Sequence, residues 1–195
     1  LRRYVKQPAT RRLYAAADVT VADGMPLVWA SGMLGTPVPE RVAGSTLIYR
    51  VAERCARERR SLFLLGGAVG SAARAASALC ERSPALYIAG CASPRVSAEP
   101  THAELEQVAR MIERARPDVL LVGLGSPKQE RVIRALRERF PQVWMVGVGI
   151  SFSFVAGQLS RAPSWMRGSG LEWLHRLAQE PQRLARRYLL EDLPF

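Results

Sequence analysis

The segment from Asp118 to Glu130 places the strongest constraint on the fold of this chain. It begins with a continuous apolar run, Val119 to Val122, which is typical of a strand buried on both faces of a parallel sheet. The chain then turns at two glycines, and we expect Ser126 to cap a helix whose first residue is Pro127. A strand that leads through a glycine turn into a helix predicts an α/β fold.

The same alternation of strand and helix patterns recurs along the chain. Strands are expected at 18–22, 61–65, 86–89, 118–122 and 143–148, and helices at 26–34, 47–59, 71–82, 101–114 and 127–140. Thr101 and Glu104 have the spacing of a capping box. This alternation predicts a Rossmann-like architecture, in which a parallel sheet with right-handed crossovers carries helices on both faces.

The composition changes after about Gly157, which divides the chain into two expected parts. Residues 1–157 form the α/β domain, and residues 158–195 form a short helical appendage rich in Arg, Trp and Leu, with helices at 170–179 and 181–190. Basic residues interleaved with Trp and Leu suit a helix pair that attracts anionic lipids. The alternative is a helix pair that packs on the sheet and leaves its arginines in solvent.

The net charge of +11 predicts a polyanionic partner, which can be nucleic acid, an anionic membrane surface or a phosphorylated substrate. The three cysteines lack Cys-x-x-Cys spacing, so neither a zinc site nor a disulfide framework is indicated, and a reducing cytoplasm fits. His102 and His175 have no ligand spacing, and we assign no metal. The longest uncharged stretch, 143–157, is too short to span a bilayer and reads as a strand followed by a loop.

The helix that follows the apolar run 119–122 carries the first candidate site residues. Lys128, Gln129 and Glu130 lie in its first turn, beside free backbone N–H groups and the positive end of the helix dipole. In an open α/β sheet this corner lies at the carboxyl edge, where ligands bind, and its chemistry suits a phosphate-bearing ligand. The alternative is a well-capped helix with a solvated first turn.

Three further positions can contribute to such a site. Asp23, at the end of the first predicted strand, can act as a general base toward a sugar hydroxyl, or it is a turn residue. The planar guanidinium of Arg41 suits a diphosphate, although it could instead pair with Glu40. Gly66 and Gly67 allow the backbone to approach a ligand closely.

Two other functional classes stay open on these patterns. A nucleotide-dependent oxidoreductase would alternate strands and helices in the same way, but the glycine run at 66–70 is neither Gly-x-Gly-x-x-Gly nor a Walker loop. A basic nucleic-acid-binding module would explain the charge. Its arginines, however, concentrate toward a Trp/Leu-rich end rather than on a recognised binding motif.

Short sequence blocks are spread over nearly the whole chain. In order they are Ala-Asp-Gly-Met-Pro at 22–26, Pro-Glu-Arg-Val-Ala-Gly-Ser at 39–45, Phe-Leu-Leu-Gly-Gly at 63–67, Gly-Leu-Gly-Ser-Pro-Lys-Gln-Glu at 123–130, Gly-Val-Gly at 147–149, Arg-Ala-Pro at 161–163 and Leu-Glu-Trp-Leu at 171–174. Their ordered combination resembles the WecG/TagA/CpsF family of bacterial glycosyltransferases.

The resemblance implies the inverting transfer of a hexose from a UDP-sugar to a polyprenyl-diphosphate-linked sugar, without a metal ion or other cofactor. The hexose is of the N-acetylmannosamine, N-acetylmannosaminuronic acid or glucose type, and the product serves cell-surface polysaccharide or teichoic acid linkage synthesis. The resemblance implies a cytoplasmic protein bound peripherally to the inner face of the membrane, with no nucleic acid partner. Homo-oligomer formation, the donor sugar and the acceptor stay open.

The resemblance also implies roles for individual residues. Asp23 corresponds to the proposed general base, Gln129 to an active-site residue and Arg41 to the diphosphate-binding arginine. The expected substrate-binding set comprises Arg41, Gly66, Gly67, Lys128, Glu130, Arg183, Arg186 and Arg187. The last three belong to the appendage, which the resemblance places against an anionic membrane surface.

Three features depart from the family pattern. Thr46 and Ser153 stand where relatives usually carry Asp, and a hydroxyl can donate or cap a helix but cannot act as a base or hold a cation. A strand that relatives carry before the first block has no counterpart. We therefore expect either a piece of a longer protein or a chain that lacks the first strand.

Overall fold

The computed structural model describes residues 5–160, 163, 166, 172–179 and 181. The chain divides into two compact units, and each is described by itself. The larger unit is Ala43–Gln158, and the smaller unit combines Leu1–Val42 with Leu159–Phe195. The larger unit carries the sheet and five of the ten candidate site residues, namely Gly66, Gly67, Lys128, Gln129 and Glu130.

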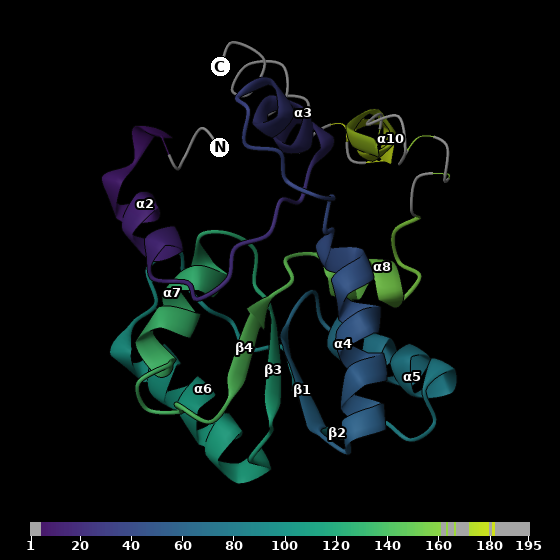
Figure 1. The fold of residues 1–195 in the computed structure, drawn as a ribbon. Helices are drawn as coiled ribbons and strands as arrows, with labels where there is room; N and C mark the ends of the chain where they lie inside the picture. Colours follow the sequence, from purple (N-terminus) through teal and green to yellow (C-terminus); the bar gives the residue numbers. More distant parts are fainter. Residues whose placement is uncertain (1–4, 161–162, 164–165, 167–171, 180, 182–195) are drawn as a thin grey trace. The chain divides into compact units, whose positions relative to one another are not determined.

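In the described part of the chain, four parallel strands form one sheet in the order β2-β1-β3-β4 (Figure 1). The strands are β1 (Ser61–Gly66), β2 (Tyr87–Ala92), β3 (Val119–Gly123) and β4 (Trp144–Gly147). The helices of this unit are α4 (Gly44–Glu58), α5 (Ser71–Arg82), α6 (His102–Ala115), α7 (Lys128–Leu136) and α8 (Ser151–Val155). The predicted α/β class and parallel sheet are confirmed.

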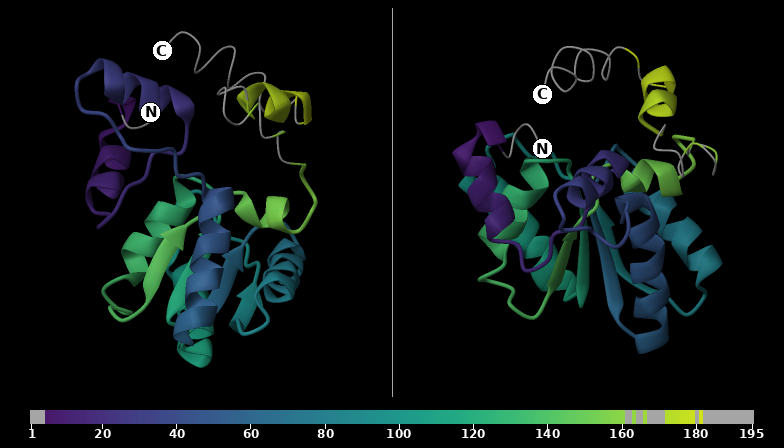
Figure 2. Two further views of the ribbon diagram at one scale, coloured as in Figure 1. Left: turned by 45° about the vertical axis from the view of Figure 1, so that its right-hand side comes forward. Right: turned by 45° about the horizontal axis from the view of Figure 1, so that its top comes forward.

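Helices cover both faces of the sheet, because the central strands β1 and β3 are apolar along both of their sides (Figure 2). Successive side chains of a strand point to opposite faces. Leu62 and Leu64 pack with α4, α5 and α8, whereas Phe63 and Leu65 pack with α6 and α7. Each fully buried Leu or Phe side chain contributes about 1.5–3 kcal/mol, so these two strands anchor the fold.

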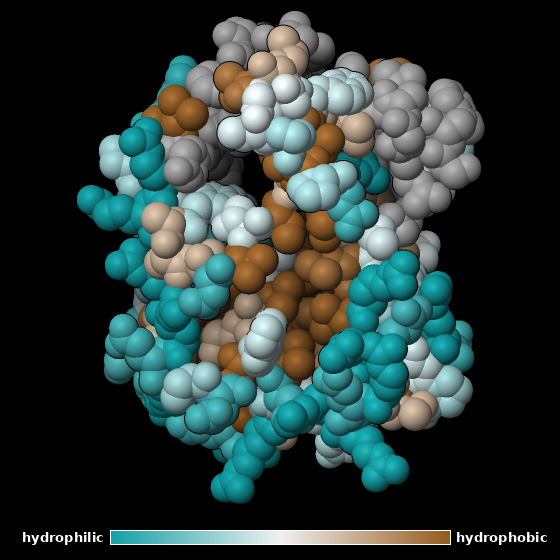
Figure 3. Space-filling view, viewed as in Figure 1, coloured by the Kyte–Doolittle hydropathy of each residue, from teal (hydrophilic) through white to brown (hydrophobic). Residues whose placement is uncertain are grey.

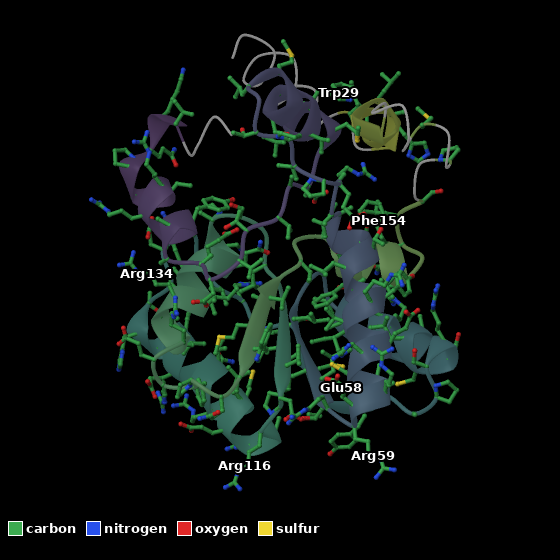
Figure 4. The ribbon with its side chains drawn as sticks, in the orientation of Figure 1. Trp29, Glu58, Arg59, Arg116, Arg134 and Phe154 are labelled. Carbon is green, nitrogen blue, oxygen red and sulfur yellow. The ribbon has the colours of Figure 1, made fainter. Side chains whose placement is uncertain are left out.

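At the amino ends of the strands, hydrogen bonds to the Asp118 carboxylate join β1 to β3. The Asp118 carboxylate accepts hydrogen bonds from the backbone N–H and the hydroxyl of Ser61, both at 2.7 Å, and from Arg60 at 3.0 Å. These bonds, led by the backbone N–H of Ser61, hold the pKa of Asp118 below its usual value. Arg59 and Arg116 end their helices in the left-handed conformation at this same end of the sheet (Figure 4).

The helix α6 begins with the capping box that its sequence predicts. The Thr101 hydroxyl accepts from the Glu104 backbone N–H at 3.3 Å, and the Glu104 carboxylate accepts from the Thr101 N–H at 2.7 Å. The second of these bonds is the main cause that lowers the pKa of Glu104. The box fixes the start of α6 and hence the path of the chain from β2 to β3.

The smaller unit contains α2 (Pro8–Ala15), α3 (Met25–Met33) and α10 (Glu172–Gln179) in its described residues. The strand predicted at 18–22 is wrong: this segment is irregular, with Val19 76% and Val21 43% exposed. Alternating valines favour a strand only where a neighbouring strand supplies a ladder of hydrogen bonds. Here the Ala22 carbonyl accepts one bond, from the Val42 N–H at 2.9 Å.

Other boundaries also differ from the predictions. The helix α7 begins at Lys128, because Pro127, with ψ of 8°, lies outside helical geometry; neither Ser126 as its cap nor Pro127 as its first residue is correct. Residues 137–139 continue from α7 as turns. The loop expected after β4 contains α8, and α2 was not predicted. No helix in the described ranges is long and apolar enough to cross a membrane.

Candidate functional site

The connections that leave β1 and β3 at their carboxyl ends run in opposite directions along the sheet. From β1 the chain passes through α5 to β2 on one side, and from β3 it passes through α7 to β4 on the other. Their last residues, Gly66 and Gly123, are paired in the sheet register. Such a switch point is the position at which open α/β sheets bind ligands. The glycines predicted as site residues therefore lie where this topology favours binding.

Backbone contacts between two loops shape this point. The Gly67 N–H donates to the Gly123 carbonyl at 2.8 Å. Gly66, with φ of +100°, comes so close that a Cβ atom there would lie 3.0 Å from both the carbonyl carbon and the oxygen of Gly123. A side chain at Gly66 would push the loops apart, so the glycine is required by both its conformation and the close approach.

The floor beneath these loops is the ring of Phe152 from α8, a residue that the sequence patterns did not identify. Phe152 is fully buried, and a Cβ atom at Gly123 would lie 2.6 Å from its ring. A Cβ atom at Gly67 would lie 3.1 Å from the same ring. The signal available in the sequence was the Gly147-Val-Gly149 block that precedes α8. Phe152 thus holds the glycine loops from below.

Two groups in the first turn of α7 that the sequence suggested were free for a ligand form hydrogen bonds within the protein. The Lys128 ammonium donates to the Val96 carbonyl at 3.1 Å, which ties α7 to the loop after β2. The Gln129 backbone N–H donates to the Gly125 carbonyl at 3.0 Å, so it is not one of the free donors expected there. The Lys128 ammonium has two further N–H donors for a ligand.

The side chain of Gln129 joins α7 to the loop after β4. Its Oε1 atom accepts from the Gly149 N–H at 3.0 Å, and its Nε2 atom donates to Oε1 of Glu130 at 3.0 Å. The amide lies so close to the end of β4 that a Cβ atom at Gly147 would come within 2.7 Å of Nε2. Three residues, Gln129, Glu130 and Gly149, therefore meet at the carboxyl edge.

The carboxyl group of Glu130 is only half satisfied. Its Oε2 atom is buried and has no hydrogen-bond partner in the described part of the chain. Buried polar atoms in proteins are nearly always paired, so an unpaired one requires an explanation.

Asp23 and Arg41 belong to the smaller unit, where their blocks lie side by side. The bond from the Val42 N–H to the Ala22 carbonyl joins the peptide group that precedes Asp23 to the one that follows Arg41. Asp23 is exposed and Arg41 is half-buried. The backbone thus brings together the predicted general base and the predicted diphosphate ligand within one unit.

The remaining predicted residues are distributed as follows. Thr46 is exposed in the first turn of α4, and Ser153 is half-buried within α8. Arg183, Arg186 and Arg187 lie outside the described residues. Across the described ranges, no three His, Cys, Asp or Glu side chains form a group that could hold a metal ion.

Two curated relatives carry the same name, N-acetylglucosaminyldiphosphoundecaprenol N-acetyl-beta-D-mannosaminyltransferase. The protein from Bacillus spizizenii is 31% identical over 182 residues, which cover 93% of this chain and 68% of the relative. The protein from Bacillus subtilis (strain 168) is 30% identical over 172 residues, which cover 88% of this chain and 65% of the relative. The chain thus spans about two thirds of the length of these relatives.

The sequence also matches a protein family described as the glycosyl transferase WecG/TagA/CpsF family, over residues 1–195. This match covers the whole chain and includes every block on which the resemblance rested. It favours the transferase interpretation over the oxidoreductase and nucleic-acid-binding alternatives. The chain belongs to the glycosyl transferase WecG/TagA/CpsF family.

Proposed function

We propose that this chain is a hexosyltransferase that moves an N-acetylmannosaminyl group from a UDP-sugar to a polyprenyl-diphosphate-linked N-acetylglucosamine. The observation that carries the proposal is the family match over residues 1–195, together with 31% identity to a relative named for this transfer. The glycine-shaped switch point of the sheet supports it, because a diphosphate needs close backbone approach and N–H donors.

In the proposed reaction, a hydroxyl oxygen of the acceptor sugar attacks the anomeric carbon of the donor. The new glycosidic C–O bond forms as the bond from that carbon to the diphosphate breaks, and UDP leaves with the electron pair. Attack opposite the leaving group inverts the anomeric centre. The hydroxyl proton passes to the carboxylate of Asp23, which acts as the general base.

Charge on the departing UDP has to be stabilised as it develops. Arg41 can present a planar pair of N–H donors to the diphosphate, and Lys128 can add a cation. Because these groups supply the positive charge, we propose that the transfer proceeds without a metal ion. Gly66 and Gly67 would allow the diphosphate to approach the backbone at the end of β1.

The acceptor in this proposal is lipid-linked, so the enzyme has to work at a membrane surface. The net charge of +11 supports attraction to anionic lipids. We propose peripheral association with the cytoplasmic face of the membrane, with Arg183, Arg186 and Arg187 among the contributing residues. The 158–195 appendage stays a prediction.

The experiment that tests the proposal is a panel of UDP-sugars assayed with a lipid-diphosphate-linked N-acetylglucosamine acceptor. We expect transfer of N-acetylmannosamine in the presence of a chelator, with inversion seen by NMR of the product. The panel is run on this chain and on a version extended at its amino end. Transfer from no donor by either version contradicts the proposed activity, whereas transfer that stops with chelator contradicts metal independence alone.

A further inference from the structure

The carboxyl group of Glu130 carries an inference that deepens the proposed function and rests on it. Glu130 lies in the first turn of α7, and its Oε1 atom accepts from Gln129 Nε2 at 3.0 Å. The Gln129 amide lies in turn against Gly147 and bonds the Gly149 N–H. These contacts place the Glu130 carboxyl group at the carboxyl end of β4, beside the switch point of the sheet.

The two oxygens of this carboxyl group have different surroundings. Oε1 is held by the amide of Gln129, which fixes the orientation of the group. Oε2 is buried without a hydrogen-bond partner among the described residues. An acceptor that is buried, oriented and unpaired is suited to receive a donor hydrogen from a bound molecule, because that bond removes the penalty for burying it unpaired.

The chemistry of a carboxyl oxygen limits which part of a nucleotide sugar can bind it. Diphosphate oxygens are anionic acceptors, so they repel a carboxylate and offer it no hydrogen. Hydroxyl groups and N–H groups of the sugar or nucleoside portions are neutral donors and match it. We propose that Glu130 Oε2 accepts a hydrogen bond from such a neutral donor group of the nucleotide sugar, and that Gln129 acts as a positioning residue for Glu130 and Gly149.

This assignment separates Glu130 from the diphosphate-binding residues with which it was grouped by sequence. Lys128 and Arg41 would hold the diphosphate, whereas Glu130 would recognise the neutral part of the donor. The two sets of residues would contact different parts of one nucleotide sugar. Removing one set should therefore weaken the binding of different test ligands from those affected by removing the other. Pyrophosphate carries the charge without the sugar, and UDP carries both.

The test compares the binding of pyrophosphate, UDP and UDP-N-acetylhexosamine to wild type and to Glu130→Gln by calorimetry. The amide keeps the size of the side chain but lets it offer only one acceptor oxygen. We expect UDP or UDP-N-acetylhexosamine to bind the variant about tenfold more weakly, the loss of one hydrogen bond to a charged group. Pyrophosphate should bind it equally well or more tightly, because repulsion is removed.

The control variant is Glu138→Gln, which changes an exposed carboxylate just beyond α7 and should bind all three ligands as wild type does. Analogues of the weakened ligand that lack single hydroxyls identify the donor, since the correct one binds wild type and Glu130→Gln alike. If Glu130→Gln unfolds, Glu130→Asp tests the same point by withdrawing the acceptor by one methylene.

Four outcomes overturn the inference. Equal binding of every ligand by wild type and variant shows that Oε2 meets no ligand, and a shift of all ligands in one direction shows a purely electrostatic role. A lowered melting temperature with unchanged affinities shows a structural role. If wild type binds neither UDP nor the UDP-sugar, the proposed donor class is itself wrong, and this inference falls with it.

Discussion

The side-chain oxygen of Gln129 accepts a hydrogen bond from the backbone N–H of Gly149 at 3.0 Å. This bond ties the helix after β3 to the loop after β4 at the carboxyl edge of the sheet. Apolar residues gather on the face of the molecule between α4 and α7, over β3 and β4 (Figure 3).

Replacing Gln129 with Met should therefore loosen the site. The change keeps the length of the side chain but leaves the Gly149 N–H unpaired, which should lower the free energy of unfolding by about 1–2 kcal/mol. The measurement is urea unfolding, with the exposed Gln107→Met as the matched control. Equal unfolding midpoints for the two variants would show that the hydrogen bond between Gln129 and Gly149 does not contribute to stability.

The close approach of Gly66 to Gly123 makes a second prediction. Gly66→Ala places a methyl group 3.0 Å from the Gly123 carbonyl at a φ of +100°, so it should destabilise the fold by about 2–4 kcal/mol and weaken UDP binding. Gly32→Ala is the control, because a Cβ atom there meets nothing within 4 Å and the helix should gain about 0.5–1 kcal/mol. Thermal unfolding of both variants decides; equal melting points would contradict the packing argument.

The sequence predicted the sheet well because its central strands carry unambiguous patterns. The apolar runs 61–65 and 119–122 correspond to buried strands, and the helix predicted at 71–82 has the observed bounds. The failure at 18–22 is of a different kind. Its valines alternate as in a strand, but a strand also needs a partner, which a local pattern cannot report.

The candidate site was predictable only as a location. Glycines after β1 and β3 indicate the carboxyl edge, because the topology of parallel sheets places them there. The contacts that orient the side chains were not accessible in this way. Lys128 bonds a carbonyl 32 residues earlier and Gln129 an N–H 20 residues later, and such pairings depend on how three loops converge.

The hydrogen bonds to the Asp118 carboxylate predict a defined dependence of stability on pH. The pKa of Asp118 is lowered by folding, so its contribution to stability is fully present above the unfolded value of about 3.9 and is lost as pH falls through the folded value. Because the carboxylate is 38% exposed, solvent screens the effect, and Asp118→Asn should cost about 1 kcal/mol at pH 7.

The difference in unfolding free energy between Asp118→Asn and wild type should shrink as the pH is lowered from 5 toward 2. Denaturant unfolding at several pH values measures it. Glu81→Gln, on the exposed face of α5, serves as the control and should show no comparable dependence. A difference that stays constant with pH would mean that the Ser61 bonds do not depend on the charge of Asp118.

The proposed general base gives a prediction about rate rather than stability. Asp23→Asn keeps the size of the side chain and its turn propensity but removes basicity, so the transfer rate should fall by about a hundredfold to ten-thousandfold while UDP affinity is unchanged. Asp18→Asn, an exposed carboxylate outside the Asp-Gly block, is the control. Turnover of Asp23→Asn near the wild-type rate would leave Asp23 as a turn residue, with the base elsewhere.

The basic appendage predicts salt-dependent binding to anionic membranes. Each arginine near such a surface contributes about 1 kcal/mol, so reversing Arg183, Arg186 and Arg187 to Glu should weaken binding to phosphatidylserine-containing vesicles. The matched control reverses the exposed Arg57, Arg110 and Arg114, which removes the same amount of charge from α4 and α6. Vesicle flotation at low and high salt is the measurement.

Added salt should weaken the binding of wild type without abolishing it, because Trp and Leu side chains of the appendage add an apolar contribution. Equal loss in both triple variants would mean that total charge, rather than the position of the three arginines, brings the protein to the membrane.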